Sequence, residues 1–331
     1  MHSGRKFTVF QTVKWTHRSI LVFILWASLV IIIHETFSLH WLMIPWFPVA
    51  LIGTALAFYL GFKNNSSYDR LWEGRKIWGG IVNTSRTWVM KVIDFPDYDK
   101  DNKDRLIKDF TYTHLAWLTS LRFALRDPRD WEHQDKGNEK LRKDFFVPEY
   151  RITEEDALKN YLPENEINKI FQANNHTTYL LKLQSHKLKQ LKSSGALDSY
   201  THLDMAATLK DLYTLQGQCE RIKNFPLPRQ YASASMIFVK IFLMLLPLGL
   251  VGEFEKISYG FIWMVIPFST LISWVFHTME LIGDYSENPF EGLPNDIPIS
   301  NLCRTIEIDL KQMIGDDTLP EEYPSRKKIH Y

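Results

Sequence analysis

The stretch FYLGFKNNSSYDRLWEGRKIWGG, residues 58–80, passes from apolar to charged residues without a break. Its residues up to Phe62 are apolar, and amide, hydroxyl and charged side chains follow from Lys63 onward. No proline separates the two halves, so one helix can continue through both. Such a helix would begin in lipid and end in water.

Four apolar runs of the chain have the length of membrane helices. The composition of the 331 residues, 45% hydrophobic and 23% charged, is that of an ordinary soluble protein. The apolar residues are nevertheless clustered at about 19–36, 41–62, 231–252 and 257–277. A bilayer core of ~30 Å needs roughly 20 apolar residues as helix. One such run fits a buried helix of a soluble protein, whereas four predict a multi-pass membrane protein.

The charges beside these runs predict their orientation. Lysine and arginine mark the cytoplasmic ends of membrane helices. Basic residues precede the first run and follow the second, whereas the two short connections carry Glu35, Glu253 and Glu255. We therefore predict a protein of the cell (inner) membrane with both termini in the cytoplasm. The first run is expected to be a retained helix, because no small-residue cleavage pattern follows it.

The remaining chain predicts helices and no strands. The expected organisation is a first membrane hairpin (1–62), a cytoplasmic helical domain (63–226), a second hairpin (227–280) and a cytoplasmic C-terminal segment (281–331). Within the cytoplasmic domain, Asn65 or Ser66 is suited to cap a helix that ends near Val92, and Thr153 to begin another. The fold class is all-α, with four transmembrane helices and a cytoplasmic helical bundle.

Composition also limits the kinds of partner and cofactor. A formal net charge of +1 gives no indication of a nucleic-acid partner. Cys219 and Cys303 are the only cysteines, too few for a disulfide framework or a cysteine metal site. No nucleophile–base motif, phosphate-binding glycine loop or zinc signature is present, so we predict neither an enzyme nor a cofactor.

Two stripes of residues stand out in the second apolar run. Thr54, Phe58 and Phe62 follow one another at i, i+4 and i+8 and share one helix face. Gly53, Ala57 and Gly61 form a neighbouring stripe of small residues, a pattern that lets membrane helices approach closely. This pattern alone favours phenylalanines that face lipid or core over rings that face a pore.

Three stretches of the chain resemble the bestrophin family of pentameric ion channels, in its bacterial branch. LGFKNNSSYDRLWEGRKIWGGIVNTSR (60–86) is similar to the family's LGFRNN motif and the residues after it. The other two are QGQCERIKNFPLPRQYA (216–232) and DYSENPFEGLPNDIPISNLCRTIE (284–307). With the four runs, the resemblance covers nearly the whole chain.

The resemblance implies a homopentamer with an axial pore lined by the second membrane helix. The family's hydrophobic neck then corresponds to Thr54, Phe58 and Phe62, and a second, cytosolic constriction falls near Leu203. Thr54 stands where bacterial members tend to have an aliphatic residue, so this ring is expected to be wetter. The implied function is conduction of monovalent ions, chloride by the family's name. The expected partners are other copies of the chain, membrane lipid and the permeating ions.

Other interpretations remain open at this point. A cation-permeable (sodium or potassium) channel of the same fold is one, and a non-conducting membrane scaffold or sensor is another. A membrane-anchored metalloenzyme would use His277, Glu280 and Asp284. Lys240, inside the third run, is costly in lipid and predicts a pairing within the bundle or an interfacial position.

Polar residues next to the motifs have less specific roles. Asn64 and Asn65 either line a hydrated vestibule or are ordinary interfacial residues. Animal bestrophins bind calcium through an acidic run after the NPF segment, but here the acids are interrupted by Gly292-Leu293-Pro294. Calcium prefers six to eight oxygen ligands, so Glu291 and Asp296 are weak candidates and we expect no calcium site.

Overall fold

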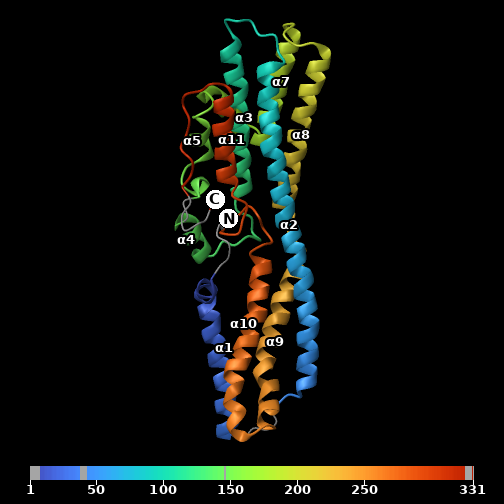
Figure 1. The fold of residues 1–331 in the computed structure, drawn as a ribbon, viewed down its shortest axis with the longest axis vertical. Coiled ribbons are helices and arrows are strands. Elements are labelled where there is room, and N and C mark those ends of the chain that lie inside the picture. Colours follow the sequence, from blue (N-terminus) through green and yellow to red (C-terminus); the bar gives the residue numbers. More distant parts are fainter. Residues whose placement is uncertain (1–7, 38–42, 145–146, 325–329, 331) are drawn as a thin grey trace. The chain divides into compact units, whose positions relative to one another are not determined.

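Helix α2 (Trp46–Asp94) contains the apolar-to-charged stretch as one unbroken helix in the computed structural model of the chain (Figure 1). The structure describes residues 8–37, 43–144, 147–324 and 330. With 49 residues, α2 is about 73 Å long, more than twice a bilayer core. The predicted helix start at Asn65 or Ser66 is wrong, because both lie inside α2 and Ser66 donates a hydrogen bond to Phe62 O at 3.0 Å.

Within the described residues, four helices are long and apolar enough to cross a membrane, as predicted. They are α1 (Val9–Phe37), α2, α9 (Arg229–Glu255) and the helical stretch Gly260–Asp284. The last combines part of the 3-10 turn η3 (Tyr259–Met264) with α10 (Val265–Asp284). Helix α1 begins earlier than its apolar run, and residues 43–45 precede α2 without helical structure. No strand occurs within the described residues, which makes this part of the chain all-helical.

The chain divides into two compact units. The four-helix unit consists of Gly4–Arg70 and Pro226–Glu287, and the bundle unit contains Leu71–Phe225 and Asn288–Tyr331. Helix α2 contributes to both units. The expected division at residues 62, 226 and 280 refers to the borders of the membrane and stays a prediction.

In the four-helix unit, one face of α2 packs closely on α9. A Cβ atom built on Gly53 would lie 2.8 Å from Cε2 of Phe242, so only glycine allows this approach. Leu56 and Leu60 of α2 are buried beside it, together with Leu246 of α9. Membrane helices associate through such close packing rather than through burial from water. The packing determines which side of α2 faces its own unit.

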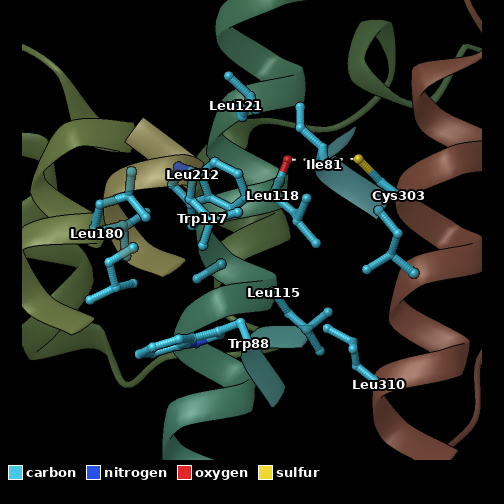
Figure 2. Close-up of a cluster of buried hydrophobic side chains, with 14 of the residues drawn as sticks. Ile81, Trp88, Leu115, Trp117, Leu118, Leu121, Leu180, Leu212, Cys303 and Leu310 are labelled. Atoms are coloured by element: carbon cyan, nitrogen blue, oxygen red, sulfur yellow. Dashed lines mark hydrogen bonds between the residues drawn. The ribbon is translucent and has the colours of Figure 1, made fainter. Parts of the chain in front are cut away.

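In the bundle unit, helix α3 (Lys103–Arg126) is surrounded by other helices. It packs against α7 (His176–Ser193), α8 (Ser199–Asn224) and α11 (Ile299–Met313), and its buried residues include Trp117 (Figure 2). Cys219 and Cys303 are buried free thiols, and Cys303 Sγ donates to Leu118 O at 3.8 Å. The remaining short helices are α4 (Lys136–Asp144), η2 (Pro148–Tyr150), α5 (Glu154–Leu158) and α6 (Glu164–Phe171).

The helix starts of this unit follow ordinary capping chemistry. Thr153 caps α5 as predicted, because its Oγ1 accepts a hydrogen bond from the Asp156 N–H at 3.1 Å. Asn175 and Asp198 cap α7 and α8 in the same way. These caps determine where the two long helices of the bundle begin.

Candidate functional site

Thr54, Phe58 and Phe62 lie on one exposed stripe of α2. Phe58 and Phe62 are each 68% exposed, whereas Leu56 and Leu60 on the other side of the helix are buried. Residues spaced by four share a helix face, so the stripe points away from the packed side of α2. Lipid, water or another chain must therefore cover this surface. The assignment of the stripe as a neck stays a prediction.

The small residues beside this stripe have two different roles. Gly53 faces Phe242 within the unit, whereas Ala57 and Gly61 are exposed. A Cβ atom built on Gly61 would meet no atom within 4 Å. Ala57 and Gly61 thus leave room next to the phenylalanine stripe, and a neighbouring helix can approach there.

The hydroxyl of Thr54 is bound to its own helix. Its Oγ1 donates to Ala50 O at 2.9 Å, so the hydroxyl proton is engaged by a backbone carbonyl of the same helix. Its lone pairs still offer an acceptor on the exposed face. Thr54 is therefore the most polar of the three predicted ring positions.

The two vestibule candidates point to different places. Asn64 Nδ2 donates to Met279 O of α10 at 3.1 Å, and a Cβ atom on Gly283 would lie 2.2 Å from Asn64 Oδ1. Asn64 is therefore packed against α10 within its own unit. Asn65 is exposed and donates to Asp69 at 3.4 Å. Of the two, Asn65 is the one on an exposed surface, and its role in a vestibule stays a prediction.

A buried ion pair follows directly after the stripe. Lys63 Nζ lies 2.5 Å from Glu280 Oε1, and Ser235 Oγ donates to Glu280 Oε2 at 2.5 Å. All three residues are buried, and they come from α2, α10 and α9. The sequence alone did not reveal the pairing of Lys63 with Glu280. The available signal was the presence of opposite charges at the predicted cytoplasmic ends of two apolar runs.

The metal set of the metalloenzyme alternative is not assembled. The carboxylate of Glu280 is occupied by Lys63 and Ser235, and His277 Nε2 lies 2.9 Å from Ser19 Oγ. In the described ranges, no three His, Cys, Asp or Glu side chains are grouped so that they could hold a metal ion. The proposed set of His277, Glu280 and Asp284 therefore has no structural support.

Leu203, the predicted cytosolic constriction, is 65% exposed on α8. Tyr200, one turn earlier, is still more exposed. Both side chains point away from the hydrophobic core of the bundle unit. This placement agrees with a surface position on α8, and the constriction itself stays a prediction.

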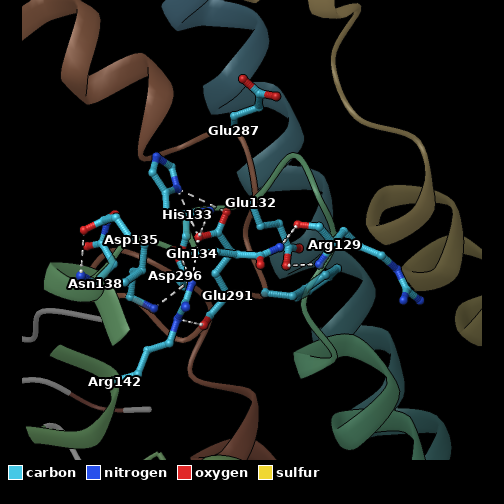
Figure 3. Close-up of polar contacts among 12 residues, drawn as sticks. Arg129, Glu132, His133, Gln134, Asp135, Asn138, Arg142, Glu287, Glu291 and Asp296 are labelled. Atoms are coloured by element: carbon cyan, nitrogen blue, oxygen red, sulfur yellow. Dashed lines mark hydrogen bonds and ion pairs between the residues drawn. The ribbon is translucent and has the colours of Figure 1, made fainter. Parts of the chain in front are cut away.

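The segment after Asn288-Pro289-Phe290 turns sharply at Gly292, whose φ of +84° suits glycine. Glu291 is buried there between Arg142 (3.2 Å) and His133 (3.0 Å), as Figure 3 shows. Arg142 also donates to the Glu291 carbonyl oxygen at 3.0 Å. The Glu291 carboxylate thus contacts Arg142 and His133 where a calcium ligand would need its oxygens free.

Asp296 is buried in the same segment. Its Oδ2 accepts a hydrogen bond from the Leu293 N–H at 2.9 Å. Burial and the negative charge of Glu291 raise the pKa of Asp296 from 3.8 to about 7.

A family sequence model and several named proteins match most of this chain. Residues 8–312 match the sequence model of the family described as Bacterial/Fungal Bestrophin protein. The voltage-dependent anion channel-forming protein YneE of Salmonella typhi is 28% identical over 291 residues, 84% of this chain and 83% of that protein. The similarly named RSc3414 of Ralstonia nicotianae is 29% identical over 299 residues, 88% of this chain and 85% of that protein.

A solved structure supports the same relationship. The crystal structure of a bacterial bestrophin homolog from Klebsiella pneumoniae superimposes with a TM-score of 0.74 at 27% sequence identity. The match covers 92% of this chain and 98% of that chain. The family match spans the four membrane helices and most of the bundle unit, and so the chain belongs to the bestrophin family.

Proposed function

We propose that the chain forms a homopentameric anion channel whose pore is lined by the exposed stripe of α2. The observation that carries the proposal is the direction of Thr54, Phe58 and Phe62, which point away from their own unit. They occupy the positions that the bestrophin resemblance assigns to the neck. Relatives that align over more than four-fifths of this chain are named anion channel-forming proteins.

A second feature supports an oligomer. Lys240 is exposed on α9, and it makes no hydrogen bond or ion pair with another described residue. It lies eleven residues after Arg229 and fifteen before Glu255, or about 16 and 22 Å along the helix. These distances exceed the reach of a lysine side chain, so lipid around Lys240 would be costly. A position at a subunit contact or a hydrated crevice avoids this cost.

In the proposed pore, the phenylalanine rings form a hydrophobic constriction. Such a constriction restricts conduction because water leaves it readily. Thr54 at the outermost of the three positions lowers this barrier, since its hydroxyl oxygen can accept a hydrogen bond from water. The proposed orientation has both termini in the cytoplasm of a cell with the protein in its inner membrane.

A cation-permeable pore of the same fold is the second candidate. Glu253 and Glu255 lie at the end of α9 that the proposed topology places outside the cell. Acidic residues at a pore mouth concentrate cations. Phenylalanine rings do not decide between the ions, because their edges attract anions and their faces attract cations.

The proposal is tested first by the mass of the purified protein and by ion flux. Five copies of the 39.0 kDa chain give about 195 kDa (5 × 39.0), apart from bound detergent and lipid. We expect this mass by light scattering and chloride efflux from liposomes that contain the protein. A monomer or dimer without flux would contradict the channel and favour the scaffold.

A further inference from the structure

The buried ion pair next to the predicted neck has a geometry suited to orienting α2. Lys63 is 0% exposed and its ammonium group contacts Glu280 Oε1 at 2.5 Å. The other oxygen of Glu280 accepts from Ser235 Oγ. One carboxylate of α10 is thereby bound to both α2 and α9. A buried ammonium and a buried carboxylate separate only at a large cost, so the three helices are held together at this level.

The position of Lys63 relative to Phe62 gives this contact a directional effect. Successive residues of an α-helix are about 100° apart around its axis. Because Lys63 is drawn toward Glu280, Phe62 is turned to the exposed side of α2, where it is observed. A rotation that moved Phe62 toward the unit would pull Lys63 away from its partner.

A second contact fixes the same rotation. Asn64 Nδ2 donates to Met279 O, one residue before Glu280. Gly283, one turn later on α10, has no side chain. Asn64 Oδ1 lies only 2.2 Å from the place that the Cβ atom of any other residue would occupy, so only glycine allows this approach. Lys63 and Asn64 therefore hold α2 to α10 immediately after Phe62.

We propose that Lys63, with Glu280 and Ser235, is a positioning residue that sets the rotation of α2 and thereby directs Phe62 into the pore. Only the statement that Phe62 faces a pore rests on the proposed function. The orientation of Phe62 itself is measurable in a protein that conducts nothing. A purely stabilising ion pair would affect folding but not the direction in which position 62 points.

The test is cysteine accessibility in the full-length protein reconstituted into liposomes. Phe62→Cys and Leu60→Cys are prepared separately, and their reaction rates with a charged methanethiosulfonate are compared. The native thiols are buried, and burial raises the pKa of both, so their background reaction is slow. We expect rapid reaction at position 62 and slow reaction at position 60, because Leu60 is buried.

Each rate is then measured in the presence of Lys63→Met, Glu280→Gln or Lys63→Arg. We expect Lys63→Met and Glu280→Gln to bring the ratio of the two rates toward unity, and Lys63→Arg to preserve it because arginine can keep the ion pair. Ser235→Ala, which leaves the Lys63–Glu280 contact in place, is the milder variant and should lower the ratio partly. Arg86→Met removes an exposed pair with Asp309 elsewhere on α2 and should change nothing.

The outcomes separate this inference from the proposed function. An unchanged ratio in Lys63→Met, Glu280→Gln and Ser235→Ala assemblies of native size would overturn the positioning role, whether or not the protein conducts. If the strong variants do not assemble, Ser235→Ala alone decides. If the variants change the ratio but the wild-type protein carries no current, the positioning role is supported and the channel is contradicted.

Discussion

At positions 58 and 62, phenylalanine rings project from α2 with most of their surface uncovered by their own chain. Large apolar side chains in that situation require a neighbour, which is lipid, another subunit or the wall of a pore. Their spacing with Thr54 gives one line along the helix. At the residue scale, the proposed channel therefore depends on these three side chains.

Removing the two rings should widen the neck. We expect Phe58→Ala combined with Phe62→Ala to raise single-channel conductance several-fold, because a hydrophobic constriction limits conduction by losing its water. Planar-bilayer recording measures this directly. Phe268→Ala removes an exposed phenylalanine of α10 and serves as the control. Equal conductance in the double variant and in wild type would refute the neck assignment.

Asp296 makes the stability of the bundle unit depend on pH. Its pKa is raised from 3.8 to about 7 in the folded protein, by burial and by Glu291. Between about pH 3.8 and pH 7, Asp296 thus keeps a proton in the folded state that it releases in the unfolded chain. The resulting stabilisation is complete below about pH 3.8 and is lost as the pH rises through about 7.

The variant Asp296→Asn should reduce this dependence. It keeps an acceptor for the Leu293 N–H and cannot ionise. We expect it to be more stable than wild type at pH 8, with an advantage that exceeds the one at pH 5 by roughly 1–3 kcal/mol. Thermal unfolding at the two pH values measures the difference. Asp101→Asn, at an exposed turn, is the control, and identical pH slopes for wild type and Asp296→Asn would count against the buried proton.

At the scale of elements, α2 shows what the sequence predicts and what it does not. The apolar run and the absence of proline predict one helix that continues from the apolar into the charged residues, and α2 confirms this continuity. Asn65 and Ser66 are residue types that cap helices, and this local preference predicted a helix start that the structure does not have. Tertiary contacts of Lys63 and Asn64, directly before that point, help to hold α2 against α10 there.

The Lys63–Glu280 pair should dominate the stability of the four-helix unit. We expect Lys63→Met alone to lower the free energy of unfolding by about 3–5 kcal/mol, because it leaves a buried carboxylate without its partner. Lys63→Met with Glu280→Met should recover most of this loss, since no buried charge remains. Thermal unfolding in detergent measures both. Equal destabilisation by the single and double variants would show that charge pairing is not the cause.

Long-range pairs of this kind are difficult to predict from one sequence. Lys63 and Glu280 lie 217 residues apart, and the sequence around either residue does not indicate its partner. The same holds for Glu291, which pairs with Arg142 from α4, a helix not predicted at all. The weak calcium candidates were identified as carboxylates, but their contacts, Arg142 and His133 for Glu291 and the Leu293 N–H for Asp296, appear only in the folded chain.

At the scale of the whole molecule, the four apolar runs and three motifs were sufficient for fold class and family. Hydrophobic length is a strong signal because a bilayer imposes it. Subunit number is different, since it depends on surfaces that one chain exposes and another covers. Phe58, Gly61 and Lys240 are such exposed positions on the membrane helices. They indicate that the chain needs neighbours, and the number five comes from the resemblance.

The most direct measurement of the central claim is the reversal potential of the purified protein in a planar bilayer under a KCl gradient. We expect a shift toward the chloride equilibrium potential, because an anion pore passes chloride in preference to potassium. A shift toward the potassium equilibrium potential would contradict anion selectivity and favour the cation-permeable alternative. No current at all from assemblies of pentameric mass would contradict conduction through the α2 stripe under these conditions.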